Sequence, residues 1–135
     1  MSAEDKTAAG MAVRRKTLGN EHVDRASGNI RPYNKEFQEF VARYGWGEVW
    51  TRPGLSHHTR RVLVMGTMVA LGKWDEFRMH LKPALKSGEF PLSDVTEILL
   101  QQTIYCGFPA GNTAFKEVAR VLEELKAEGV TVEGS

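Results

Sequence analysis

One histidine, His80, stands at a position from which it could supply a proton. It lies three residues after Phe77 and four before Ala84, so a helix would point its side chain toward the apolar face rather than into water. An imidazole titrates near neutral pH and can act as a general acid. The alternative is a histidine satisfied within the core or at a subunit seam, and the spacing leaves both open.

A second group of chemical residues lies in the stretch WGEVWTRPGL, which we expect to be a loop. Trp46 and Trp50 flank Glu48, and Arg52 follows. An arginine held beside aromatic rings is partly desolvated, and its planar fork suits a carboxylate. Glu48 could orient Arg52 or His80, and Trp50 could form a pocket wall. The alternative is a packing corner in which the indoles fill a gap between helices.

The basic stretch from Gly10 to Ile30 offers a second cation. Arg14 or Arg15 could bind another carboxylate, and His22 is a weaker candidate in the same stretch. The arginines could equally be a solvated run of charge. The stretch predicts either an arm that packs on a neighbouring subunit or a short helix followed by a loop, with a turn at Gly19.

Tyr105 and Asn112 flank a Gly-Phe-Pro-Ala turn that leads into a helix. A hydroxyl, an amide and helix N-terminal N–H groups would converge there, which suits an oxyanion or a carboxylate. The alternative is ordinary hydrogen bonding at helix ends. The single Cys106 allows neither an intrachain disulfide nor a CxxC motif, and it reads as a small buried hydrophobe.

We expect no metal centre. His57 and His58 are adjacent at a helix start, where we expect them to face solvent, and neither His22 nor His80 has a ligand partner three or four residues on.

Apolar residues recur at helical spacing in five segments, and no segment reads as a strand, so the predicted class is all-α. The expected helices run from an Asn34 cap to Gly45, from a Ser56 cap to Gly72, from Trp74 to Lys86, from a Ser93 cap with Glu97 in a capping box to Gly107, and from Pro109 to Ala127.

The 135 residues suffice for one domain, which we place at 10–128 between a disordered tail at 1–9 and a frayed C-terminal tail at 129–135. With 18 basic and 17 acidic residues the net charge is +1, so no strong field would attract nucleic acid or an anionic membrane. No apolar run approaches the roughly 18 residues of a membrane span, and no export signal is visible, so we expect a cytoplasmic protein.

Three blocks of sequence carry a resemblance to a known family. They are GMAVRRKTLGNEHVDRA at 10–26, WGEVWTRPGL at 46–55 and LLQQTIYCGFPAGNTAF at 99–115. Together they resemble the 4-carboxymuconolactone decarboxylase family over about residues 10–125. Departures are small; for example, Gly111 stands where that family usually has alanine.

The resemblance implies an all-α helical bundle of the alkylhydroperoxidase D-like type, assembled as a homo-oligomer, either a hexamer or a trimer. It implies cofactor-free decarboxylation of a lactone diacid, 4-carboxymuconolactone, to the β-ketoadipate enol-lactone in protocatechuate catabolism. For that reaction His80 would be the acid, with Glu48 and Tyr105 also catalytic. The substrate-binding residues would be Arg52, Arg15, Arg14, Trp50, His22 and Asn112.

Two other functions stay open on the sequence. Peroxidase relatives of that superfamily carry a CxxC motif four residues before a histidine, and aligning that histidine with His80 puts Lys73 and Glu76 at the cysteine positions. Disulfide chemistry is therefore disfavoured. The third possibility is a non-catalytic helical oligomer that binds small acids.

Overall fold

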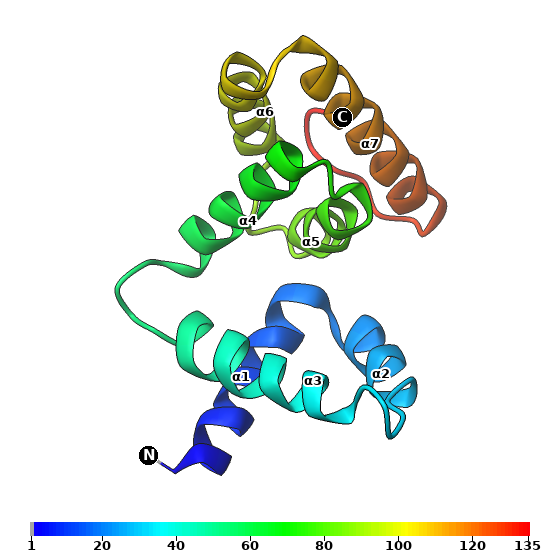
Figure 1. The fold of residues 1–135 in the computed structure, drawn as a ribbon. Coiled ribbons are helices and arrows are strands. Elements are labelled where there is room, and N and C mark those ends of the chain that lie inside the picture. Colours follow the sequence, from blue (N-terminus) through cyan, green and yellow to red (C-terminus); the bar gives the residue numbers. More distant parts are fainter. Residues whose placement is uncertain (1) are drawn as a thin grey trace. The chain divides into compact units, whose positions relative to one another are not determined.

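The computed structural model describes residues 2–135, and all its regular elements in that range are helices (Figure 1). The predicted all-α class is confirmed. The elements are α1 (Ala3–Leu18), α2 (Asn20–Gly28), α3 (Lys35–Phe40), the π-helix η1 (Val41–Trp50), α4 (His57–Leu71), α5 (Trp74–Lys86), α6 (Leu92–Cys106) and α7 (Phe108–Ala127).

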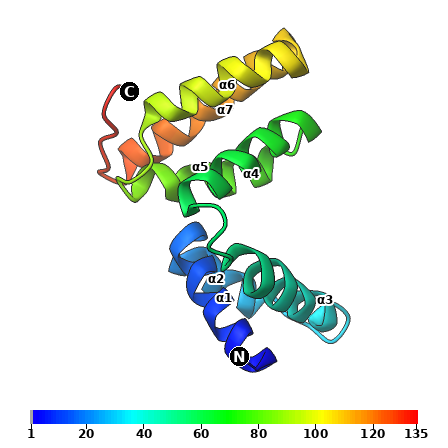
Figure 2. The ribbon, with the colours of Figure 1, turned by 90° about the vertical axis from the view of Figure 1, so that its left-hand side faces the viewer.

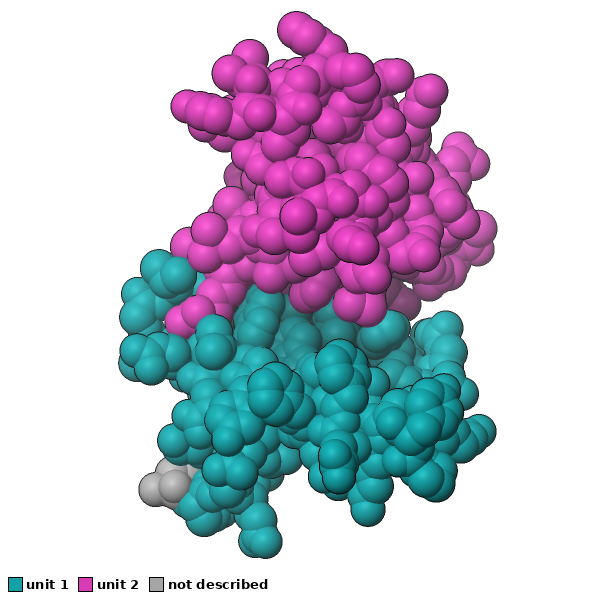
Figure 3. Space-filling view, in the orientation of Figure 1, with its two compact units in different colours: residues 1–57 teal, residues 58–135 magenta. Residues whose placement is uncertain are grey.

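The chain divides into two compact units, residues 1–57 and residues 58–135, which Figure 3 colours separately. The single domain expected at 10–128 stays a prediction.

The second unit has a continuous apolar core. Its α5 contributes Phe77, Leu81 and Ala84, and α7 packs against α5 and α6. Figure 2 shows α6 and α7 running alongside each other. The buried residues on α5 and α7 recur at helical spacing, as predicted. The first and last residues of α4, α5 and α7 lie within one residue of the predicted ends.

Ion pairs join α5 to α7 beside the apolar core. Arg78 binds Glu117, and Lys82 approaches Glu124 at 3.2 Å. The Lys82–Glu124 pair is partly exposed and contributes little, whereas the Arg78–Glu117 pair is mostly buried and adds to the apolar contact between the two helices.

The cap predicted for α6 is wrong. The N-cap is Pro91 rather than Ser93, and no side chain caps the helix. The Pro91 carbonyl already accepts the N–H of Asp94 at 3.0 Å, so the helix begins one residue before Ser93 and the predicted capping box does not form.

The first unit begins with a helix where a disordered tail was expected; Met1 lies outside the described residues. Ser2 caps α1: its hydroxyl accepts the N–H of Asp5 at 3.1 Å, and the Asp5 carboxylate accepts the N–H of Ser2 at 3.2 Å. This reciprocal capping box leaves few orphan donors at the helix start, so the prediction of disorder at 2–9 is wrong.

The helix predicted to stop at Gly45 instead continues, and the expected loop from Trp46 is helical as far as Trp50. A close contact with α1 explains this. A Cβ built on Gly10 would lie 2.4 Å from the backbone nitrogen of Gly47, and one on Gly47 would lie 2.7 Å from the Lys6 carbonyl oxygen. The two backbones therefore touch, and this packing outweighs the low helix propensity of glycine.

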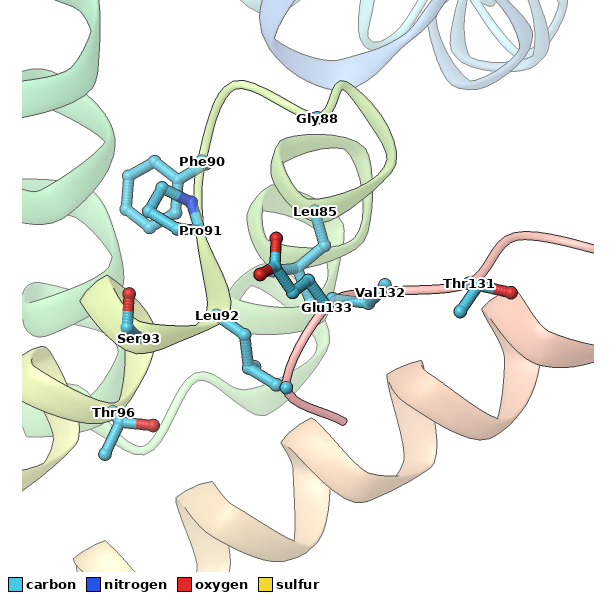
Figure 4. Close-up of a pocket in the computed structure, with 11 residues that line it drawn as sticks. Leu85, Gly88, Phe90, Pro91, Leu92, Ser93, Thr96, Thr131, Val132 and Glu133 are labelled. Carbon is cyan, nitrogen blue, oxygen red and sulfur yellow. The ribbon is translucent and has the colours of Figure 1, made fainter.

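The C-terminal segment after α7 is packed rather than frayed. The Val130 N–H donates to the Leu125 carbonyl at 2.9 Å, and Val132 packs against the core. Figure 4 shows Val132 and Glu133 beside Leu85 and Leu92. These residues line a hollow of about 590 Å³. Two valines at alternate positions keep this short segment on the core.

A substitution at the glycine contact tests whether the α1–η1 packing holds the first unit together. Gly10→Ala should lower the free energy of unfolding by about 1–3 kcal/mol, because the added methyl group meets backbone that cannot move aside. Urea denaturation followed by tryptophan fluorescence measures the change. Gly28→Ala is the matched control, since open space surrounds its Cβ position. Equal stabilities of the two variants would contradict the close contact.

Candidate active site

The π-helix η1 presents Glu48 to α1. Both oxygens of the Glu48 carboxylate accept hydrogen bonds from the Lys6 ammonium group, at 3.1 and 3.0 Å. The approach of Gly10 to Gly47 sets the helix spacing at which this half-exposed pair forms. The described partner of Glu48 is therefore Lys6, which the sequence did not suggest. Lys6 could not have been found by periodicity, because it lies 42 residues away.

Trp50 lies between two other rings, those of Trp46 and His57. Its indole stacks on Trp46 with centroids 4.8 Å apart and lies tilted against His57 at 5.8 Å. Trp46 is buried, so one end of this row is fixed in the core of the first unit. A flat, rigid wall of this kind can bound a binding site. The role of Trp50 as a pocket wall stays a prediction.

His57 is held by Thr17, contrary to the expectation that it faces solvent. The Thr17 hydroxyl lies 2.7 Å from the Val13 carbonyl oxygen and 2.8 Å from His57 Nε2. A carbonyl can only accept, so the single hydroxyl hydrogen goes to Val13. The hydroxyl then accepts from His57, which places a proton on Nε2.

His58 pairs within the second unit. Its Nε2 lies 2.7 Å from the Asp94 carboxylate, and its ring stacks on Phe90 at 4.6 Å. This contact joins the start of α4 to the first turn of α6, so His58 is structural.

The two adjacent arginines of α1 differ in their partners. Arg15 binds the Asp24 carboxylate at 2.8 Å and the Asn20 side-chain oxygen at 3.2 Å, which ties α1 to α2. The Arg14 Nε is buried and has no hydrogen-bond partner among residues 2–135. Burial lowers the pKa of the Arg14 guanidinium, and the charge of Arg15 lowers it further. A partly buried guanidinium whose Nε lacks a hydrogen-bond partner suits an anionic ligand.

His22 lies in the field of Arg14. Burial lowers the pKa of the His22 imidazole, and the positive charges of Arg14 and Arg25 lower it further. The ring is therefore held neutral at pH values where a free histidine would begin to protonate. An anion bound at Arg14 would oppose this effect, so His22 and Arg14 form one electrostatic group.

Arg52 lies on the exposed turn that follows η1. Its N–H donates to the Val49 carbonyl at 3.0 Å. This hydrogen bond closes the turn after Trp50. The Arg52 side chain is exposed, so its guanidinium extends from a turn rather than from the core. Its role as a carboxylate ligand stays a prediction.

His80 lies on the buried face of α5, as its spacing predicted. It is 7% exposed and sits one residue before Leu81 and four before Ala84, both fully buried. A buried imidazole in an apolar helix face is shielded from bulk water. Its role as the acid stays a prediction.

Tyr105 and Asn112 are both exposed; Tyr105 has 78% of its surface accessible. They lie on either side of Gly107, whose φ of 99° ends α6 and begins α7. Close packing at this junction also explains Gly111: a Cβ there would lie 2.2 Å from Thr103 Oγ1. Cys106 is half-buried and has no disulfide. Exposed side chains here could form an anion site only if something covers them.

Sequence reasoning missed a buried arginine on α4. Arg61 is 2% exposed, and burial lowers its pKa while Glu89 acts in the opposite direction. The signal was present in the sequence, because Arg61 precedes the buried Met65 and Val69 by four and eight residues on one helical face. Arg61 is therefore a further candidate for binding a carboxylate.

The lowered pKa of His22 predicts how stability changes with pH. Above about pH 7 the ring is neutral in both folded and unfolded chains. As the pH falls toward 5, the unfolded chain takes up a proton first, so stability is lost. The unfolding free energy of the wild type should fall more steeply over this range than that of His22→Gln, measured by urea denaturation at each pH. Parallel curves would contradict the assignment.

Comparison with known proteins identifies the family. The sequence model of the carboxymuconolactone decarboxylase family matches residues 35–120. A 4-carboxymuconolactone decarboxylase of Acinetobacter baylyi is 38% identical over 93% of this chain and 92% of its own length. The nitrosuccinic acid decarboxylase npaB of Metarhizium robertsii is 31% identical over 89% of this chain and 83% of its own. A 48-residue match to a 4-carboxymuconolactone decarboxylase of Pseudomonas putida is 42% identical. The chain belongs to the carboxymuconolactone decarboxylase family.

Proposed function

We propose that this protein decarboxylates 4-carboxymuconolactone to the β-ketoadipate enol-lactone. The observation that carries the proposal is the 38% identity to a 4-carboxymuconolactone decarboxylase over nearly the full length of both chains. The second curated relative is also a decarboxylase, which supports the reaction class. A thiol peroxidase is disfavoured because the chain has one cysteine. A carboxy-lyase is therefore favoured over both a peroxidase and a non-catalytic binder of acids.

The chemistry of this substrate explains why few protein groups are required. Loss of carbon dioxide leaves an electron pair on the ring carbon that bore the carboxylate. The ring alkene passes that charge to the lactone carbonyl oxygen, and the resulting dienolate is protonated on carbon. The protein then supplies cations that hold the carboxylates, donors near the developing oxyanion and one acid.

Each role is assigned to residues whose chemistry fits it. His80 returns the proton, with Glu48 and Tyr105 assisting. Arg52 and Arg14 hold carboxylates. Arg14 is preferred to Arg15 because Asp24 and Asn20 already occupy the Arg15 guanidinium. Supporting contacts come from Trp50, His22 and Asn112.

The relative from Metarhizium robertsii points to a second candidate substrate class. Nitrosuccinic acid, which its name gives as the substrate, is also a diacid that bears an electron-withdrawing group beside a carboxylate. A nitro group can accept the electron pair as a lactone ring does. A small nitro-substituted diacid is therefore the second substrate to test, with the same residues holding the two carboxylates.

The setting of the reaction is proposed with it. We assign the protein to the cytoplasm, acting without a cofactor, as a homo-oligomer (hexamer or trimer) that binds neither nucleic acid nor membranes. No helix among residues 2–135 has both the length and the apolar character to cross a membrane.

Replacing the imidazole tests the proton donor. His80→Ala should lower carbon dioxide release by about 10²-fold or more, because proton return loses its acid. The loss of the lactone's absorbance measures turnover, with no metal or cofactor added. Size-exclusion chromatography provides the control, since the assembly should keep its size. Turnover close to wild type would remove His80 from this role.

Two matched substitutions test which arginine binds the substrate. Arg52→Lys should raise KM at least several-fold with a smaller effect on kcat, because a point charge cannot replace a bidentate fork. Arg61→Lys is the comparison, since Arg61 is buried on α4 whereas Arg52 is exposed. A KM effect in Arg61→Lys alone would move the carboxylate site to α4.

A further inference from the structure

The helix formed by α3 and η1, together with the turn before it, carries an aromatic stripe that the first unit leaves uncovered. This stripe consists of Tyr33, Phe37, Phe40 and Tyr44, which are 89%, 63%, 61% and 45% exposed. The rings of Phe40 and Tyr44 contact each other at 5.0 Å, so these two share one face. Soluble proteins rarely expose several large aromatic side chains close together unless they bind something. The helix is the cyan to teal ribbon in Figure 1.

The stripe is large enough to contribute much of a protein interface. An aromatic side chain buries about 150–250 Å², so the four exposed fractions amount to about 500 Å² on each copy. A stable interface buries about 800 Å² per partner. Two residues of the stripe, Phe40 and Tyr44, also line a hollow of about 780 Å³ together with Met11 and Arg14 of α1. Side chains of a partner can fill this hollow.

Two charges on the same side of this helix indicate what covers it. Glu36 and Arg43 both line the hollow together with Phe40, and they are seven residues apart. Neither forms an ion pair within residues 2–135, whereas the neighbouring Lys35 pairs with Glu39 at 3.9 Å. Arg43 lies over the Tyr44 ring, 5.1 Å from its centroid. Beside the Lys35–Glu39 pair, α3 and η1 therefore present one acid, Glu36, and one base, Arg43, that have no ion-pair partner among residues 2–135.

We infer that the occupant is a second copy of this chain, paired antiparallel through the same helix. A twofold axis beside Phe40 sets Glu36 opposite Arg43 of the partner subunit, and the symmetry makes this pair twice. A parallel arrangement would set like charges together, which is costly. Because the same patch is used on both copies, the contact closes on itself as an isologous pair.

This inference rests on the self-association proposed above and not on the decarboxylase reaction. The probe is the purified full chain, whose assembly size is measured by sedimentation velocity over a range of concentrations. Glu36→Arg and Arg43→Glu should each weaken self-association at least about tenfold, giving a smaller assembly, because each sets like charges opposite one another. Both residues are exposed, so circular dichroism should show an unchanged fold.

Mixing the two single variants gives the decisive measurement. In a mixed pair, both contacts regain opposite charges, so the mixture should recover wild-type assembly, as should the double variant Glu36→Arg/Arg43→Glu. The matched control is Lys116→Glu with Glu123→Arg on α7, an exposed pair of opposite charges at the same spacing, which should change nothing.

The remaining outcomes overturn the inference in distinguishable ways. Single variants that assemble like the wild type would exclude this face as an interface. Weakened singles that do not recover on mixing would show that the stripe docks on a different surface of another copy. A monomeric wild type would remove the proposed self-association itself, and a separate lactone assay on the same sample would still decide the reaction.

Discussion

The backbone contact between Gly10 and Gly47 is the constraint on which the first unit depends. Two helices can approach this closely only where neither carries a Cβ, and here the contact lets η1 continue beyond the point where glycines would be expected to end it. The continuation brings Glu48 to Lys6 and Trp50 to His57. A small unit with few buried apolar side chains thus obtains a rigid arrangement from close packing rather than from a large core.

The adjacent residues Arg14 and Arg15 look alike in the sequence but differ in their hydrogen-bond partners in the structure. Arg15 is occupied by Asp24, whereas Arg14 has a buried nitrogen that no described residue satisfies, and it depresses the pKa of His22. A buried guanidinium nitrogen without a hydrogen bond is costly, and an anionic ligand or partner would satisfy it. The proposed diacid substrate has two carboxylates, and the main task of the protein in this reaction is to bind them with positively charged groups.

Both compact units also leave apolar side chains exposed, with the aromatic stripe in the first unit and Ile104, Tyr105 and Phe108 around the α6–α7 junction in the second. A chain of 135 residues cannot bury all of its apolar surface within itself. Association covers such surface without lengthening the chain. The exposure of Tyr105 and Asn112, two proposed site residues, is consistent with groups that a neighbouring copy or a ligand covers.

The sequence alone determined the helices from His57 to Ala127, because their apolar residues repeat with the period of a helix, although the cap it predicted for α6 is wrong. It also determined the buried side of His80, by the same periodicity. Only the tertiary structure decided that Glu48 pairs with Lys6, that Arg15 is engaged while Arg14 is not, and that η1 extends to Trp50. Those contacts join groups up to 42 residues apart in the sequence. A local sequence pattern cannot predict which distant backbone or charged group a side chain will contact.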